Sequence, residues 1–237
     1  MRREFIIAVR AMIVTAIAFG LIYPLAITGI GQVIFPGKAN GSLIKRDGVV
    51  VGSALIGQQF YEDVIGANGK VEMSKGTPVT QPDPKYFQTR PSGTVPADNA
   101  EASSFANYGP NSTVTLAALQ ANVTTYLCMN ASVPFATCDS KGFNKADTLY
   151  DPHVTSAAQV PVDAADTSAS GVDPDISVAN AKIQAYRVAA VRHLSLATVD
   201  RLVSQNTTAR SLDFLGEPGV DVLELNLALD RISNGSK

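Results

Sequence analysis

The feature that most constrains this chain is a long uncharged stretch near its N-terminus. From Ala11 to Ile30 no charged residue occurs, and most side chains are aliphatic or aromatic. An α-helix rises ~1.5 Å per residue, so about 20 such residues cross the ~30 Å hydrocarbon layer of a bilayer. We therefore predict a transmembrane helix over residues 11–34.

The charges before this stretch predict its orientation. Arg2, Arg3 and Arg10 precede the apolar run, and only Glu4 opposes them. Cationic residues before a first span keep that end of the chain in the cytoplasm. Residues 1–10 are therefore expected in the cytoplasm and residues 35–237 outside it, in a single-pass protein of the cell membrane that also contacts lipid.

A cleaved signal peptide is the alternative to an anchor. Such peptides have a shorter apolar core, followed by small residues at a cleavage site. The Ala16-Ile17-Ala18 triplet lies inside the apolar run, too early to end it, and the run continues to Phe35. The pattern favours an uncleaved anchor.

Small residues and a proline recur every fourth position within the predicted span. The stripe consists of Ala16, Gly20, Pro24 and Thr28. Small residues let a second transmembrane helix approach closely, and Pro24 is expected to bend the helix. We interpret the stripe, with the adjacent Tyr23, as a packing face for a partner helix; chance spacing is the alternative.

The remainder of the chain predicts a mixed domain. A β-hairpin is expected around the Asp47-Gly48 turn, and helices are expected over residues 114–127 and after the N-cap residues Ser177 and Ser195. A strand leading into a helix is expected at the C-terminus, and irregular loops over residues 61–84 and 130–166. The predicted fold class is α+β: one N-terminal transmembrane helix followed by a mixed α/β extracytoplasmic domain.

Within the helix after Ser177, Ile183, Tyr186 and Ala190 are expected to share one face. The net charge of -2 offers no basic patch, so nucleic acid is not an expected partner.

The sequence offers little catalytic machinery. His153 and His193 are the only histidines, and neither has cysteines or carboxylates at metal-ligand spacing. Ser168, Ser170, His153 and Asp163 include the residue types of a hydrolase triad, but no G-x-S-x-G motif is present. The nucleotide-binding glycine motifs and the Asp-Lys-Thr-Gly motif of phosphorylated ion pumps are also absent. We expect no catalytic residue, bound metal or cofactor.

Cys128 and Cys138 are the only cysteines. An oxidising compartment would permit a disulfide between them, and two separate buried thiols are the alternative.

Several short motifs, spread over residues 23–230, together resemble the C subunit of Kdp potassium-transporting ATPases. They are Tyr23-Pro24-Leu25, Ala39-Asn40-Gly41-Ser42-Leu43-Ile44, Gly52-Ser53-Ala54-Leu55-Ile56-Gly57-Gln58, Tyr86-Phe87, Arg90-Pro91-Ser92, Ser168-Ala169-Ser170-Gly171-Val172-Asp173, Gln184, Arg187-Val188-Ala189, Phe214-Leu215-Gly216-Glu217-Pro218 and Leu223-Glu224-Leu225-Asn226-Leu227-Ala228-Leu229-Asp230.

The resemblance implies a complex with a potassium-channel-like pore subunit, a P-type ATPase subunit and a small helical subunit. ATP and K⁺ would then belong to the complex rather than to this chain. It also implies a catalytic chaperone that raises the ATP affinity of the pump subunit, with Ser168, Ser170, Gly171 and Gln184 as nucleotide-related positions. A turn and a helix cap, with Gln184 on the surface of the helix, is the simpler interpretation of these four residues.

The sequence thus predicts a non-catalytic accessory subunit that stabilises assembly. The alternative is a stand-alone, membrane-anchored enzyme or binding protein, which would require a convergent polar cluster. We find no such cluster in the sequence.

Overall fold

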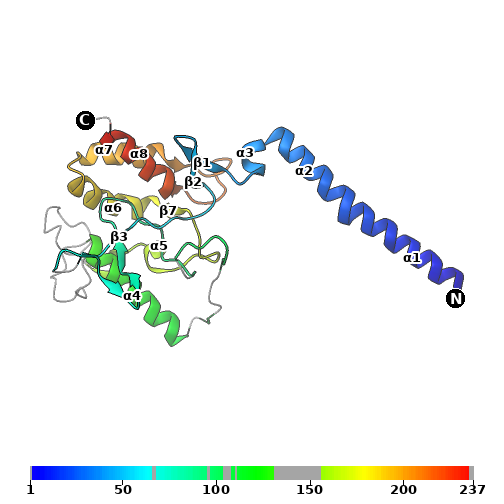
Figure 1. Cartoon of the computed structure of the whole chain (residues 1–237), viewed down its shortest axis with the longest axis horizontal. Coiled ribbons are helices and arrows are strands. Elements are labelled where there is room, and N and C mark those ends of the chain that lie inside the picture. Colours follow the sequence, from blue (N-terminus) through cyan, green and yellow to red (C-terminus); the bar gives the residue numbers. More distant parts are fainter. Residues whose placement is uncertain are drawn as a thin grey trace. The chain divides into compact units, whose positions relative to one another are not determined.

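The computed structural model describes residues 2–65, 68–94, 97–103, 108–109, 111–130 and 156–234 (Figure 1). By its internal contacts the chain divides into two compact units, Met1–Leu55 and Ile56–Lys237. The mixed helix and sheet content and the apolar N-terminal helix confirm the predicted fold class.

The first unit consists of a long helix and a hairpin. Its elements are α1 (Arg2–Ile17), η1 (Ala18–Ile22), α2 (Tyr23–Ile34), α3 (Pro36–Ala39), β1 (Leu43–Arg46) and β2 (Val49–Ser53). The first three form one continuous helix, Arg2–Ile34, which is long and apolar enough to span a membrane (Figure 1). No residue in its most apolar stretch is buried within the unit.

Pro24 is accommodated in this helix by a local widening. Proline lacks an N–H group, and its ring collides with the carbonyl group four residues earlier in a regular helix. The segment Ala18–Ile22 is a π turn, in which the N–H of Tyr23 donates to the carbonyl of Ala18. The wider turn lets the helix continue past the proline instead of ending there.

The predicted hairpin is confirmed. β1 and β2 pair antiparallel around a turn in which Asp47 and Gly48 have φ values of 51° and 81°. Asn40 connects the preceding turn to the long helix through two reciprocal amide hydrogen bonds with Gln32, of 3.0 and 3.2 Å. The side-chain hydroxyl of Ser53 donates to the carbonyl of Gly41 over 2.7 Å.

The second unit contains the helices and the main sheet. Its elements are β3 (Tyr61–Asp63), β4 (Met73–Ser74), β5 (Thr77–Pro78), β6 (Thr80–Pro82), α4 (Thr113–Asn130), η3 (Ala157–Gln159), α5 (Val162–Ala165), β7 (Asp175–Ser177), α6 (Val178–Val191), α7 (Leu196–Gln205), β8 (Thr207–Thr208), β9 (Gly219–Asp221) and α8 (Val222–Asn234).

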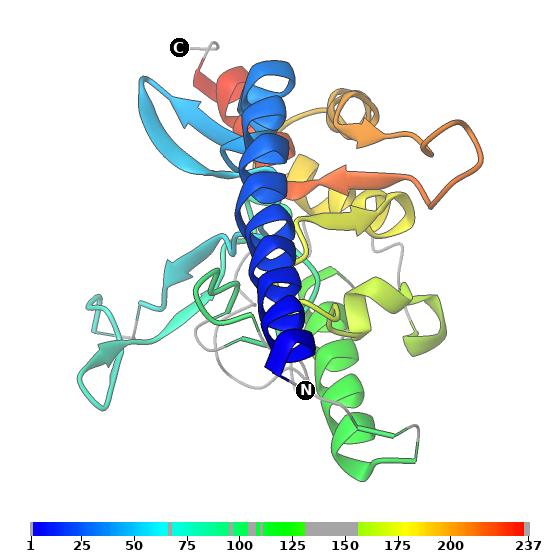
Figure 2. The same cartoon turned by 90° about the vertical axis from the view of Figure 1, so that its right-hand side faces the viewer.

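A small antiparallel sheet, in the order β7-β9-β8, organises the C-terminal half of this unit. Ile176 of β7 lies opposite Val220 of β9, and Thr207 of β8 lies on the other side of Val220. The connection from β8 to β9 extends outward from the sheet as the orange loop of Figure 2.

The core lies where α6, α7 and α8 pack with this sheet. Its buried side chains are Phe87, Ile176, Ala181, Ala185, Val188, Ala189, Val199, Leu202, Val203, Val220, Val222, Leu225 and Leu229. The predicted caps are confirmed, because the Ser177 and Ser195 hydroxyls accept from the backbone N–H groups of Asn180 and Thr198.

Two local predictions were wrong. Residues 61–84, expected to form a loop, contain the four short strands β3 to β6, two of which form the ladder β3-β6 seen at the left of Figure 2. Their two or three residues are too few for an alternating pattern to be visible. The most buried face of α6 contains Ala181, Ala185 and Val188 rather than the predicted Ile183, Tyr186 and Ala190. Polar residues of α6 are buried on this face as well, so the spacing of apolar residues alone did not locate it.

Asp221 predicts a pH dependence of stability. Burial, the largest cause, and the charges of Glu224 and Asp175 together raise the pKa of its carboxyl group from 3.8 to about 6, although a hydrogen bond from the Glu224 N–H opposes the rise. The folded state therefore holds a proton that the unfolded state releases, and the free energy of unfolding should fall as the pH rises from about 4 to about 6.

Asp221→Asn should abolish this pH-dependent fall in the free energy of unfolding, because an asparagine side chain does not ionise. It keeps the side-chain oxygen that caps α8. Above pH 6 the variant should be more stable by about 1 to 2 kcal/mol, a value reduced for solvent screening of a partly accessible carboxylate. Thermal unfolding of the detergent-solubilised chain between pH 4.5 and 7.5 measures the effect. Asp213→Asn, on an exposed loop, is the control, and the same flattened profile in both variants would contradict the assignment to Asp221.

Candidate functional site

The second unit contains a segment, Pro84–Gln88, that begins in a turn and is held by amide side chains from two helices. Asn226 of α8 accepts from the N–H of Phe87 and donates to its carbonyl, both over 2.9 Å. Gln184 of α6 does the same for the next residue, Gln88, over 2.8 and 3.0 Å. The two amides replace the neighbouring strands that would satisfy this backbone in a sheet. We call Pro84–Gln88 the clamped segment.

A buried arginine holds the same segment. The guanidinium of Arg187, only 1% exposed, donates to the carbonyl groups of Pro84 and Tyr86. It also donates to Asn130 Oδ1 over 3.0 Å and to Gln184 Oε1 over 2.8 Å. Arg187 therefore links the clamped segment, α4 and α6 through neutral acceptors.

The outer end of the clamped segment is held by Arg192. Its guanidinium donates to the carbonyl of Lys85 over 2.7 Å and forms a 3.0 Å ion pair with Asp230. It also lies over the ring of Tyr86, 4.5 Å from the ring centre, while the Tyr86 hydroxyl donates to Asp230. Burial, together with the charge of Asp230, raises the pKa of Tyr86.

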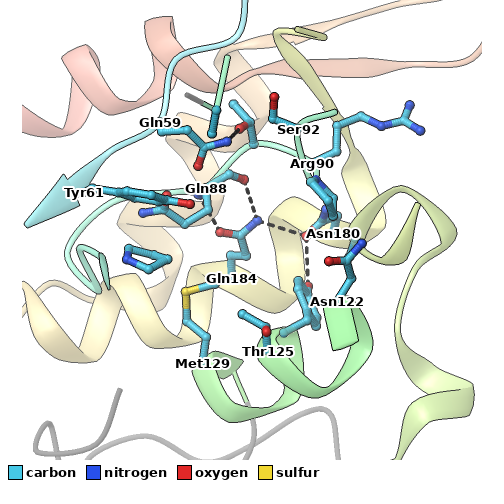
Figure 3. A pocket seen from close by; sticks show the side chains of 16 residues that line it. Gln59, Tyr61, Gln88, Arg90, Ser92, Asn122, Thr125, Met129, Asn180 and Gln184 are labelled. Atoms are coloured by element: carbon cyan, nitrogen blue, oxygen red, sulfur yellow. Dashed lines mark hydrogen bonds between the residues drawn. The ribbon is translucent and has the colours of Figure 1, made fainter. Parts of the chain in front are cut away.

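Next to the clamped segment lies a pocket of about 250 Å³ (Figure 3). Amide side chains dominate its polar lining: Gln59, Gln88, Asn122, Asn180 and Gln184. Tyr61, Tyr126 and Met129 contribute larger apolar surfaces. The pocket is therefore a convergent cluster of polar groups, neutral apart from the guanidinium of Arg90, and we did not find this cluster in the sequence.

One wall of the pocket is fixed by a hydrogen-bonded chain. Asn180 Oδ1 accepts from Gln184 Nε2 and from the Tyr126 hydroxyl, both over 2.9 Å, as the dashed lines in Figure 3 show. Asn180 Nδ2 donates to Asp163 over 3.0 Å, and Asp163 also accepts from the Ser177 hydroxyl. Burial strongly raises the pKa of Tyr126, so its hydroxyl stays protonated and acts as a donor.

The predicted nucleotide-related positions occupy two different environments. Ser168 accepts from the Gly171 N–H over 2.9 Å, and Gly171, with a φ of 74°, closes the turn. The hydroxyl of Ser170 accepts from the backbone N–H of Val172, which confirms the turn. Gln184 is 1% exposed and lines the pocket, so the expectation of a helix-surface glutamine was wrong.

Sequence reasoning did not assign Gln88, Asn180, Arg187 or Asn226 to a site, although Arg187 and Asn226 lie in the motifs of the resemblance; all four are buried. A signal was available on α6, where polar residues at positions 180, 184 and 187 follow the helical period among alanine and valine. Polar residues on a core-facing stripe indicate a buried network, because each must find a partner there.

Several predicted residues lie outside the pocket or outside the described residues. Asp163 contributes to capping α6, and His153 lies outside the described residues. His193 has a φ of 56° just beyond the end of α6. Cys128 takes part in a disulfide, which favours the predicted disulfide over two separate buried thiols. Cys138 lies outside the described residues. Across the described part of the chain, no cluster of three or more His, Cys, Asp or Glu could hold a metal ion.

The stripe in the first unit is aligned by the π turn. In a regular helix, positions four apart rotate by ~40° per step, so the stripe would drift by ~120° from Ala16 to Thr28. A π turn advances by only ~80° per residue, so the five residues of η1 remove roughly 100° of that drift. A Cβ atom added at Gly20 would have no atom within 4 Å other than those of the adjacent helix backbone.

Comparison with known proteins identifies the family. A model of the family KdpC, described as "K+-transporting ATPase, c chain", matches residues 5–231. The chain belongs to the KdpC family. A relative from Mycobacterium tuberculosis H37Rv is 43% identical over 98% of this chain and 100% of its own length. Relatives from Methylococcus capsulatus and Herpetosiphon aurantiacus are 42% and 40% identical, over 95% and 99% of this chain and 96% and 99% of their own lengths. All three are named potassium-transporting ATPase KdpC subunits.

Membership of the KdpC family confirms the predicted resemblance. The chain covers the full length or nearly the full length of these relatives, so the comparison includes both the apolar helix and the second unit.

Proposed function

We propose that this chain is a non-catalytic accessory subunit of an ATP-driven potassium uptake complex. The observation that carries the proposal is the match to the KdpC family over residues 5–231. The exposed apolar helix Arg2–Ile34 supports it, since such a helix needs lipid or another membrane helix around it. The partners are a channel-like pore subunit, a P-type ATPase subunit and a small helical subunit.

The orientation follows from the charges and the cysteine chemistry. Arg2, Arg3 and Arg10 support an N-terminus in the cytoplasm and a second unit outside it. The disulfide of Cys128 suits that side, because disulfides persist in oxidising compartments and are rare in the cytosol.

The pocket supports a role without catalysis. Its polar lining is made of amides, hydroxyls and the guanidinium of Arg90, and neither an amide nor a guanidinium exchanges protons near neutral pH as a general base must. ATP hydrolysis and potassium conduction then belong to the partner subunits. Any effect of Gln184 on ATP affinity is indirect, because its amide is already engaged in four hydrogen bonds within the domain.

The stripe offers a way to test docking of the helix. Gly20→Leu adds bulk where two helices would approach closely, and should weaken the association by about 1 to 2 kcal/mol. Because the space around a Cβ atom at Gly20 is open, the fold of the chain itself should not change. The measurement is the amount of pore and ATPase subunit that copurifies with the tagged chain in mild detergent.

Ile13→Leu, off the stripe, is the control and should retain both partners. Equal losses in the two variants would remove the stripe from the proposal. Purification of the unaltered chain without any larger membrane subunit would instead indicate a stand-alone anchored protein.

A further inference from the structure

The pocket beside the clamped segment contains a buried acceptor that the protein does not use. Gln88 is 4% exposed, and its Nε2 donates to the carbonyl groups of Phe60 and Asp83 over 2.9 and 3.0 Å. Its Oε1 atom is buried and has no hydrogen-bond partner among the described residues. A buried acceptor of this kind costs stability unless a ligand or water donates to it.

Two further amides on the lining are oriented in the same way. Gln59 donates its Nε2 to Thr89 Oγ1, and Asn122 donates its Nδ2 to the carbonyl of Ala165, each over 2.8 Å. Each nitrogen is thus held to the protein through one of its two N–H groups, and the oxygen is the acceptor of each amide. Figure 3 shows these side chains around one opening, with Gln88 between Gln59 and Gln184.

Arg90 is the exception, because its Nε is a buried donor without a partner in the described part of the chain. Its guanidinium, however, is directed to Asp173 over 3.1 Å and to the backbone carbonyl of Thr167. In Figure 3 it extends away from the amide groups. The acceptors, not this donor, therefore define the interior of the pocket.

Carboxylates behind the lining increase its preference for positive charge. Thr89, which holds Gln59, donates to Asp98 over 3.1 Å, and Asn180 donates to Asp163. Such chains of hydrogen bonds polarise the amide oxygens at their other end. Burial raises the pKa of Tyr61 on the pocket wall, and the charge of Asp98 raises it further, so the field of Asp98 reaches the pocket.

We propose that this pocket binds a primary ammonium group. An ammonium group carries three N–H donors and no acceptor, which complements the three amide oxygens of Gln59, Gln88 and Asn122. A cavity of 250 Å³ has room for about eight water molecules at ~30 Å³ each, so it fits a small amine or the end of a lysine side chain. This assignment does not depend on the accessory function proposed above.

Methylammonium tests the proposal directly. The ¹⁵N-labelled full-length chain in detergent micelles is titrated with methylammonium chloride and, separately, with tetramethylammonium chloride at equal ionic strength. The side-chain amide signals of Gln59, Gln88 and Asn122 should shift saturably with methylammonium only, because tetramethylammonium has the same charge but no N–H donor. No saturable shift, or equal shifts with both cations, would overturn the proposal.

Two substitutions at Asn122, a half-buried position, should act in opposite directions. Asn122→Leu removes one acceptor and should weaken methylammonium binding about fivefold or more, whereas Asn122→Asp keeps an acceptor, adds negative charge and should strengthen it. Gln120→Leu, exposed on the same helix, should leave binding unchanged. Weakening by both substitutions at Asn122 would contradict the proposal.

The source of the ammonium group is decided by repeating the titration on the assembled complex. Binding to the complex as well as to the free chain identifies a free amine as the ligand. Binding to the free chain alone identifies a lysine of a neighbouring subunit, which already fills the pocket in the complex. Failure of the free chain to bind methylammonium rejects both sources.

Discussion

Arg187→Leu should unfold the second unit at temperatures where the parent chain remains folded. The substitution leaves the carbonyl groups of Pro84 and Tyr86, Asn130 Oδ1 and Gln184 Oε1 without the donor that the guanidinium supplied. Each hydrogen bond to a charged donor contributes about 1.5 to 3 kcal/mol, and they are not additive, so we expect a total loss of about 4 kcal/mol. A domain of this size has roughly 5 to 15 kcal/mol of stability to lose.

The measurement is thermal unfolding of the full chain in detergent, followed by circular dichroism. Arg201→Leu is the matched control, because Arg201 is exposed on the neighbouring helix α7. It should change the melting temperature little. Similar melting temperatures for Arg187→Leu and the parent chain would show that the clamped segment is held mainly by its apolar neighbours.

The sequence predicted those elements whose signals are local. The Asp47-Gly48 turn predicted its hairpin, and Ser177 and Ser195 predicted the starts of α6 and α7, because turn geometry and capping depend on a few adjacent residues. The charge-free run predicted the apolar helix, although the helix begins at Arg2 rather than at Ala11. A helix can extend beyond the apolar run wherever the flanking residues, such as Arg and Glu, also form helices readily.

The candidate site could not be predicted in the same way. Gln88 and Gln184 are 96 positions apart in sequence, and Phe87 and Asn226 are 139 apart. Their bonds depend on packing between elements, which a local pattern does not encode. The sequence did single out Gln184 through its motif, but the motif alone could not distinguish a surface position from a buried one that supports a backbone segment.

A structural role of Gln184 can be distinguished from a contact with nucleotide, because a second residue, Asn226, makes the same kind of hydrogen bonds to the clamped segment. Asn226 holds Phe87 as Gln184 holds Gln88, through a reciprocal pair of hydrogen bonds to the backbone. Replacing either amide by leucine leaves a buried N–H and a buried carbonyl of the clamped segment unpaired, and replacing Gln184 also removes its bonds to Asn180 and Arg187. Asn226→Leu should therefore lose about 3 kcal/mol of unfolding free energy, and Gln184→Leu should lose at least as much.

Gln184→Leu and Asn226→Leu should also behave alike in the assembled complex. If both amides only hold the clamped segment, both variants should reduce the amount of complex that assembles, while the apparent ATP affinity of the complex that remains stays that of the parent. Steady-state ATPase activity as a function of ATP concentration, normalised to assembled complex, measures this. A selective loss of ATP affinity in Gln184→Leu, with Asn226→Leu unaffected, would instead indicate that Gln184 acts on the nucleotide. That result would also contradict an extracytoplasmic second unit, since ~30 Å of hydrocarbon would separate the glutamine from cytoplasmic ATP.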